Sequence, residues 1–109
     1  MPLTSVPERQ WYLLTSKPFK DELAELELGK QGYEVYRPLA QRLRKQRGKM
    51  VKKTESLFPR YLFIALNQFT DNWAPIRSTK GVNQFVRFGT QPALVPSELI
   101  INLKSQELA

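Results

Sequence analysis

The sequence predicts an α+β domain: a mostly antiparallel four-stranded sheet flanked by helices, in the order β-α-β-β-α-β-α, with a protruding basic β-hairpin. Three observations indicate this fold class. Short aromatic and aliphatic runs alternate with segments of helical spacing. One run is apolar on both faces, which is typical of a strand at the centre of a sheet. A stretch rich in lysine and arginine has a glycine near its middle and almost nothing to bury, which favours an exposed hairpin.

The first strand is predicted over residues 11–15, where Trp11, Leu13 and Thr15 share a face. Residues 16–18 then predict the start of a helix, because a proline is favoured at the first helical position. The helix is expected to pack on the sheet through three apolar residues at helical spacing, which are Phe19, Leu23 and Leu26. Gly29 or Gly32 is expected to end it.

Residues 33–36 predict a second strand, and Pro38 keeps the chain extended after it. Residues 40–56 hold the basic stretch, for which a long polar hairpin around Gly48 is the simplest interpretation. A disordered basic loop is the alternative.

The central strand is predicted over residues 60–66. Its side chains form two apolar faces: Tyr61, Phe63 and Ala65 on one, and Leu62, Ile64 and Leu66 on the other. Pro59 cannot donate to a ladder, so it is expected at the strand entry. The aromatic face, begun by Phe58, is either a second core layer or a surface that meets a partner.

A turn is expected at 67–71 and a short helix at 72–79, with Pro75 in its first turn and Gly81 after it. Residues 82–88 predict another strand. The last helix is expected to carry an apolar stripe made of Leu99, Ile100, Leu103 and Leu108.

The 109 residues suit one domain, expected at 10–109 after a loose leader at 1–9. Cysteine and histidine are absent, so no disulfide or thiol chemistry is expected, and the commonest general base and metal ligand are missing. No apolar run approaches about 18 residues, so we expect no membrane span and a cytoplasmic protein. No nucleotide-binding or hydrolase motif is present, so we expect no enzyme, no cofactor and no metal site.

The net charge of +7 indicates a polyanionic partner, most often a nucleic acid. Eight of the 17 basic residues lie between Arg37 and Lys53, whereas the acidic residues gather on the first predicted helix. Lys17 and Lys80 would extend this basic track if the loops that carry them lie together. A stretch similar to an RNA-recognition motif at residues 80–88 has an extra residue and lacks the early aromatic one.

Five motifs, in order, carry a family resemblance: W-Y-L-L at residue 11, L-F-P-R-Y-L-F at 57, S-T-K-G-V at 78, F-V-R-F-G at 85 and V-P-S-E-L at 95. The chain resembles the N-terminal domain of the NusG family over about residues 10–105. The wording of the second and fourth motifs is most similar to the RfaH branch.

The resemblance implies a transcription elongation factor whose partner is bacterial RNA polymerase. The domain would dock on the clamp helices of the largest catalytic subunit, bridge to the opposite lobe and suppress pausing and termination. The docking residues that the resemblance implies are Trp11, Phe58, Pro59, Tyr61, Phe63, Phe88, Ile100 and Leu103.

Contact with upstream and non-template DNA is the second implication. It would involve Lys17, Arg42, Arg44, Lys45, Arg47, Lys49, Arg77, Thr79 and Lys80. The chain departs from the RfaH pattern at Leu23 and Glu27, where that branch carries an arginine and a histidine. A threonine-rich stretch that meets the opposite lobe in RfaH is replaced by residues 72–75.

Family members usually continue into a KOW-type β-barrel, whereas this chain ends at Ala109. We therefore expect either a truncated piece or a natural single-domain form, and a monomer. Glu55 stands where the resemblance implies an interdomain contact, so a missing C-terminal domain is expected to mask Phe58 and Tyr61.

Two other functions remain open from the sequence. One is an RNA- or single-strand-binding module that uses an aromatic sheet face and the basic hairpin. The other is a small structural or ribosome-associated basic protein that binds duplex or folded RNA.

Overall fold

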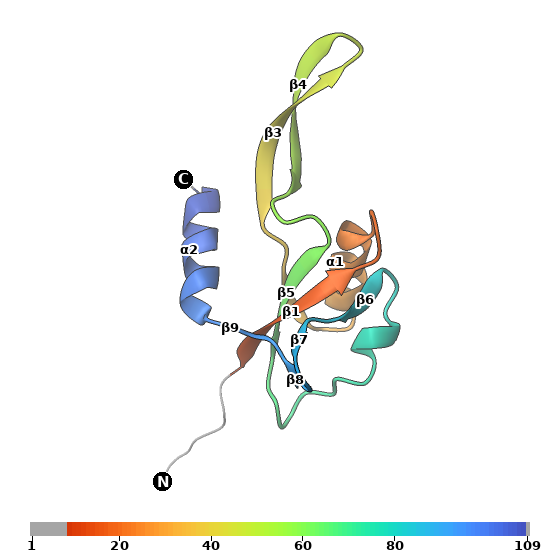
Figure 1. Cartoon of the computed structure of the whole chain (residues 1–109), viewed down its shortest axis with the longest axis vertical. Coiled ribbons are helices and arrows are strands. Elements are labelled where there is room, and N and C mark those ends of the chain that lie inside the picture. The colour runs from red at the N-terminus through yellow and green to blue at the C-terminus, as the bar shows by residue number, and fades with distance from the viewer. Residues whose placement is uncertain (1–8, 109) are drawn as a thin grey trace.

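A five-stranded antiparallel sheet forms the centre of the computed structural model, which describes the backbone of residues 9–108 and the side chains of residues 9–107 (Figure 1). The strand order is β2-β5-β1-β6, and β9 also pairs with β1. The strands are β1 (Gln10–Ser16), β2 (Glu34–Tyr36), β5 (Tyr61–Leu66), β6 (Val82–Phe85) and β9 (Leu94–Val95). The predicted fold class is confirmed, with one strand more than expected. The leader predicted at 1–9 lies outside the described residues except for Arg9.

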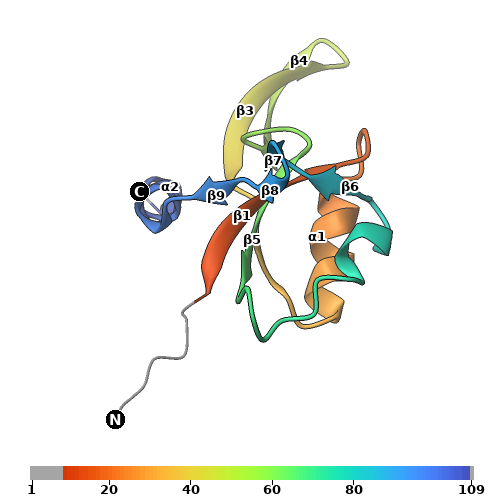
Figure 2. The same ribbon diagram turned by 60° about the horizontal axis from the view of Figure 1, so that its bottom comes forward.

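β5 is the central strand, as predicted, because β2 and β1 pair with its two edges. Its aliphatic side chains are fully buried, and Phe63 and Ala65 on the other face are only 5% and 4% exposed. Helices α1 (Asp21–Lys30) and α2 (Ser97–Leu108) lie on opposite sides of the sheet (Figures 1 and 2). The sheet is therefore covered from both sides along β5.

The core lies between the sheet and α1. Ala24 and Leu28 of α1 are fully buried there together with Ile76. The ring of Trp73 closes one end of this layer, 5.3 Å from the ring of Phe85 and 4.8 Å from that of Tyr12. These aromatic contacts hold the segment after β5 against β1 and β6.

The prediction that the first helix packs on the sheet through Phe19, Leu23 and Leu26 is wrong. Phe19 is 96% exposed and Leu26 is 56% exposed. The helix begins at Asp21 instead of near Pro18, because residues 17–20 form a turn in which the Lys20 amide donates to the Lys17 carbonyl at 3.0 Å. The later start makes Ala24 and Leu28 the positions that face the sheet.

The basic stretch forms the predicted hairpin from β3 (Leu39–Gln46) and β4 (Lys49–Ser56). Gln46 pairs with Lys49 across a two-residue turn in which Arg47 and Gly48 both have positive φ, 52° and 79°. Such turns match the twist of the strands they join. The hairpin extends along the longest dimension of the molecule, 63 Å (Figure 1).

The segment after β5 differs from its prediction. The expected helix at 72–79 is reduced to the 3₁₀ turn η1 (Ile76–Ser78), because the Ala74 amide donates to the Asn72 side chain and the Ile76 amide closes a turn on the Trp73 carbonyl at 3.2 Å. The strand expected at 82–88 is broken at Val86. Its second half, β7 (Arg87–Phe88), pairs with β8 (Gln91–Pro92) in a small hairpin outside the main sheet.

α2 buries less of its predicted stripe than expected. Ile100 is 2% exposed and Leu103 is half-buried, whereas Leu99 is 44% exposed. The side chain of Leu108 lies outside the described residues. Among residues 9–108, no helix is long and apolar enough to cross a bilayer.

Candidate functional site

The face of the sheet opposite α1 carries the aromatic side chains that the sequence singles out. Trp11, Leu13 and Thr15 of β1 lie directly opposite Ala65, Phe63 and Tyr61 of β5. Direct partners in an antiparallel pair project to the same face. The aromatic face is therefore shared by the two innermost strands.

α2 crosses this face and divides it into a covered and an open part. The Lys104 ammonium lies 5.3 Å from the Trp11 ring centroid and 5.2 Å from that of Tyr36. The Glu107 carboxylate accepts hydrogen bonds from the Tyr36 hydroxyl at 3.3 Å and from the Leu39 amide. These contacts fix the helix against β1, β2 and the start of β3.

Phe63 and Ile100 lie in the covered part as a second core layer. The Phe63 ring stacks on that of Tyr36 with centroids 6.2 Å apart. Burial and the Glu107 carboxylate raise the pKa of Tyr36 to about 12. Neither Phe63 nor Ile100 is presented at the surface, although the sequence resemblance implied both as docking residues.

The open part is formed by Phe58, Pro59 and Tyr61, which we call the aromatic patch. Phe58 and Tyr61 are 40% and 42% exposed. The Tyr61 amide donates to the Phe58 carbonyl at 3.0 Å, with Arg60 at a φ of 74°, so the patch is part of a closed turn. The Arg60 guanidinium donates to the Ser16 carbonyl at 3.1 Å and anchors this turn to the end of β1.

A groove adjoins the patch between α2 and the base of the hairpin. Apolar and polar side chains both line it: Pro38, Leu39, Ala40, Gln41, Thr54 and Leu57 from the hairpin base and its flanks, and Leu103, Gln106 and Glu107 from α2. Leu57 and Leu103 are half-buried. Leu57 directly precedes the patch in the chain, so the aromatic patch borders a groove of mixed polarity.

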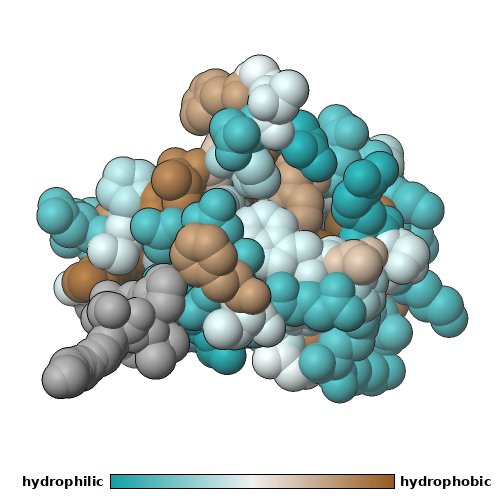
Figure 3. Space-filling model, turned by 90° about the horizontal axis from the view of Figure 1, so that it is seen from below, coloured by the Kyte–Doolittle hydropathy of each residue, from teal (hydrophilic) through white to brown (hydrophobic). Residues whose placement is uncertain are grey.

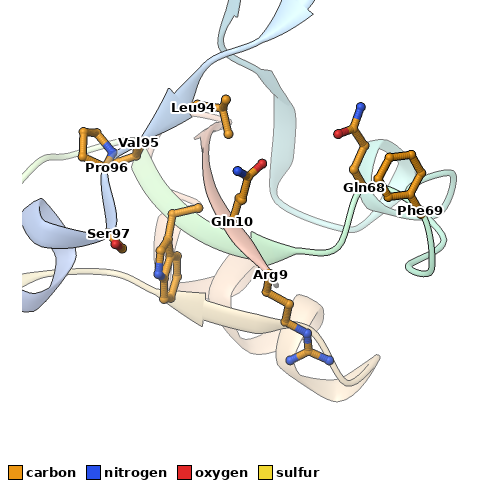
Figure 4. Close-up of a pocket in the computed structure, with 9 residues that line it drawn as sticks. Arg9, Gln10, Gln68, Phe69, Leu94, Val95, Pro96 and Ser97 are labelled. Carbon is orange, nitrogen blue, oxygen red and sulfur yellow. The ribbon is translucent and has the colours of Figure 1, made fainter. Parts of the chain in front are cut away.

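The remaining predicted docking residues are placed elsewhere. Trp11 is half-buried under Lys104, and Phe88 is 76% exposed on the separate β7–β8 hairpin. Trp11 also lines a second groove, which has Phe69 on one side and Leu94 and Pro96 on the other (Figure 4). At this end of the molecule apolar side chains form separate spots among hydrophilic ones (Figure 3).

The basic residues form two groups. On the hairpin, Arg42, Arg44, Lys45, Arg47 and Lys49 are exposed or half-buried. Arg44 donates to the Glu55 carboxylate at 2.7 Å, and this hydrogen bond is the main cause that lowers the pKa of Glu55. Glu55, predicted as an interdomain contact, is thus paired within the hairpin.

The second basic group surrounds the loop between β1 and α1. The Lys17 amide donates to the Gly81 carbonyl at 2.8 Å, so the loops that carry Lys17 and Lys80 do lie together. Arg77 is exposed, but Thr79 is 7% exposed. Its hydroxyl donates to the Pro75 carbonyl at 2.9 Å and accepts from Gln31 at 2.8 Å. Thr79 is therefore a structural residue and not part of the basic surface.

Sequence reasoning missed one exposed residue in this second group, Phe19, because helical spacing placed its ring in the core. The positive φ of 62° at a residue that follows a proline is the structural signal. Within the described residues, no group of three or more acidic, histidine or cysteine side chains could hold a metal ion.

Comparison with known proteins gives one family. A sequence profile described as "NusG: Transcription termination factor nusG" matches residues 9–104. Among solved structures, the chain is similar to one titled "Domain interaction in Thermotoga maritima NusG", with a TM-score of 0.52 and 24% identity. The match covers 84% of this chain and 52% of that chain, so this chain spans about half the length of the Thermotoga protein. At this identity the likeness concerns the fold.

Proposed function

The chain belongs to the NusG family, and we propose that it is a transcription elongation factor domain that docks on the clamp helices of the largest catalytic subunit of bacterial RNA polymerase. Family membership supports a role in transcription elongation or termination. We further propose that docking bridges the DNA channel and suppresses pausing, and that the chain is closest to the RfaH branch, on the wording of its L-F-P-R-Y-L-F and F-V-R-F-G motifs.

The aromatic patch is the observation that carries this proposal. Phe58 and Tyr61 keep two fifths of their surface exposed although they continue the most deeply buried strand of the domain. Exposed aromatic side chains next to a groove are typical of binding hot spots. The adjoining groove between α2 and the hairpin base, with Leu57 and Leu103 among its lining, would admit part of a helix.

The burial pattern refines the residues that would touch polymerase. Phe58, Pro59 and Tyr61 would make the contact, with Leu57 and Leu103 lining the groove. Phe63 and Ile100 would support these residues from beneath, because their side chains are 5% and 2% exposed. Trp11 and Phe88 would lie at the margin.

The hairpin is the part that would reach toward DNA. It projects beyond the sheet and presents lysines and arginines along both strands (Figure 1). Such a surface contacts phosphates with affinity that falls as salt rises, and it carries little sequence information. Lys17, Arg77 and Lys80 would extend this contact beyond the hairpin, without Thr79. The loop that follows Lys17 shares a groove with residues of the hairpin base.

The alternative of a sheet that stacks nucleic-acid bases has less support from the geometry. Phe63 is buried beneath α2, the Tyr36 ring lies under Lys104, and Phe88 is outside the main sheet. Of the aromatic side chains of β1, β2 and β5 on that face, only Tyr61 is exposed, and Trp11 is half-buried. The exposed basic hairpin still favours nucleic-acid contact of the phosphate type.

The test is binding of this chain to core RNA polymerase with nucleic acid removed, comparing the unaltered chain with Tyr61→Ala. We expect Tyr61→Ala to weaken binding by about tenfold or more, roughly 1.4 kcal/mol. Phe69→Ala is the matched control, because Phe69 is 73% exposed and lies outside the patch. Absence of binding, or equal loss in both variants, would contradict docking through the aromatic patch.

A further inference from the structure

The turn between β1 and α1 has a phenylalanine at a position where the backbone conformation favours glycine. The Lys20 amide donates to the Lys17 carbonyl at 3.0 Å, with Pro18 and Phe19 as the central residues. A proline followed by a residue of positive φ is the pattern of a type II turn, in which glycine is preferred at the second central position. Phe19 occupies that position with a φ of 62°.

The ring of Phe19 also contributes little to the folded chain. It is 96% exposed, more than any other large apolar side chain among the described residues. A strained backbone position and a fully hydrated aromatic ring both act against stability. Strained backbone positions cluster at active sites and ligand-binding sites.

Four cationic residues lie in the turn that carries Phe19 or in the loops beside it. Lys17 and Lys20 are the first and last residues of the turn, and the Lys17–Gly81 hydrogen bond brings the loop of Lys80 alongside. Arg60 reaches the same place, since it donates to the Ser16 carbonyl. All four side chains are exposed, and among residues 9–107 none of them forms an ion pair.

Cations outnumber acids around Phe19. Phe19 lies on the rim of a groove that Arg37, Arg42, Arg44 and Arg60 also line. Of the acidic residues in that groove, Glu22 is ion-paired with Arg37 at 3.6 Å and Glu55 with Arg44 at 2.7 Å, whereas Asp21 keeps its charge and accepts a hydrogen bond from Ser56. Lys17, Lys20 and Lys80 add three further cations beside the groove, so the net charge near the ring is positive.

We propose that Phe19 stacks on an unpaired base of a single-stranded nucleic acid whose phosphates lie against Lys17, Lys20, Lys80 and Arg60. An exposed aromatic ring within a cationic rim has the composition of single-strand binding sites, because every base offers a π-face and every nucleotide a negative charge. The inference rests on the nucleic-acid contact in the proposed function. It assigns to that contact a residue outside both the hairpin and the sheet.

The test measures fluorescence anisotropy of labelled oligothymidylate, oligouridylate and a DNA duplex with the whole chain at low salt. We expect Phe19→Ala to weaken binding of at least one single strand by about fivefold or more, and Phe19→Trp to preserve or tighten it. Phe69→Ala, another exposed aromatic residue, should bind as the unaltered chain does. The two single strands distinguish DNA from RNA. Duplex binding should be nearly unchanged in Phe19→Ala, since it offers no unpaired base.

Phe19→Gly separates binding from folding. Glycine adopts the positive φ freely, so this variant should melt no lower than the unaltered chain and still lose single-strand affinity to the same extent as Phe19→Ala. The proposal is overturned if the unaltered chain binds no single strand. It is equally overturned if both variants bind normally, or if single-strand and duplex binding fall equally.

The same variants report separately on the proposed function. Phe19→Ala should bind nucleic-acid-free polymerase normally, because Phe58 and Tyr61 carry the proposed docking contact and Phe19 shares only the groove beside Pro59. Polymerase binding with no effect of Phe19 on single strands would overturn only this inference. An effect of Phe19 without polymerase binding would overturn only the docking proposal.

Discussion

Arg37 donates a hydrogen bond to the hydroxyl of Ser56 at 2.8 Å across the base of the hairpin. Ser56 in turn donates to the carboxylate of Asp21 at the start of α1, and Arg37 contacts Glu25 at 3.0 Å. The Arg37 side chain is only 10% exposed. A polar network, in which Arg37 and Ser56 are mostly buried, therefore ties the base of the hairpin to α1.

Arg37→Ala should destabilise the domain by about 1.5–3 kcal/mol, the range for hydrogen bonds to charged groups. The substitution leaves Glu25 and Ser56 without their partner in a partly desolvated site. Urea unfolding followed by tryptophan fluorescence measures the change. Arg44→Ala is the matched control, because its 55% exposed side chain forms only a surface pair with Glu55. That variant should change stability far less than Arg37→Ala, because exposed ion pairs contribute little to stability; equal losses would contradict the network.

Acid should weaken the same network. Partial burial raises the pKa of Asp21, but hydrogen bonds from Ser56 and from backbone amides outweigh it and leave the pKa below its usual value. The unfolded chain then takes up the proton first, so the stability from Asp21 is complete above about pH 4 and is lost as the pH falls through the lowered value. Unfolding free energies measured from neutral to acid pH should show this loss. Ser56→Ala should make the decline shallower, and an unchanged slope would contradict the assignment.

Much of the fold follows from local sequence pattern. The two-faced apolar alternation at Leu62–Leu66 predicts the central strand, and Arg47–Gly48 supplies the positive φ that a tight hairpin needs. The exposure of Phe19 could not be predicted, because Pro18 is compatible both with the start of a helix and with a turn. Which of the two forms depends on the tertiary hydrogen bond between Lys17 and Gly81.

The candidate site could likewise be predicted from the sequence only in part. Phe58 and Tyr61 follow from the excess of aromatic residues on one face. The apolar stripe of α2 predicts that this helix packs on the sheet, but it does not predict which strands the helix covers. The burial of Phe63 therefore depends on tertiary packing and could not be predicted from the sequence. Thr79 is polar and flanked by exposed basic residues in the sequence, and only the contact with Gln31 reveals its structural role.

The docking of α2 can be followed through Tyr36. Burial and Glu107 raise its pKa to about 12, so the neutral hydroxyl is favoured in the folded state. The contribution of this pair to stability is complete below the usual tyrosine value of about 10 and is lost as the pH rises toward about 12. Glu107→Gln should lower the pKa of Tyr36 in an ultraviolet titration of tyrosinate absorption. Glu98→Gln, at the other end of α2, should leave the titration unchanged, and a similar shift in both variants would contradict direct contact.

Gly81 marks a close approach of two loops. A Cβ at this position would lie 2.8 Å from the Ala24 nitrogen and 2.9 Å from the Lys20 carbonyl oxygen, and its φ is 86°. Gly81→Ala should therefore destabilise the domain by about 2 kcal/mol or more, because backbone atoms must shift. Gly29→Ala provides the contrast. A Cβ there meets nothing within 4 Å in a helical position, so thermal denaturation should show a gain of about 0.5–1 kcal/mol. A neutral Gly81→Ala variant would contradict the loop arrangement.

Substitutions of Phe63 and Tyr61, which lie on the same strand, can distinguish a role in core packing from a role in docking. Phe63 is 5% exposed and stacks on Tyr36, whereas Tyr61 is 42% exposed. Phe63→Ala should cost about 3–5 kcal/mol of stability, as for a buried aromatic ring, and Tyr61→Ala about 1 kcal/mol. Urea unfolding gives both values. Polymerase binding, measured under conditions in which both variants remain folded, should fall more in Tyr61→Ala than in Phe63→Ala, because only Tyr61 reaches the surface. If the two losses run in parallel, weakened binding reflects instability of the domain, and the aromatic patch is not a separate interface.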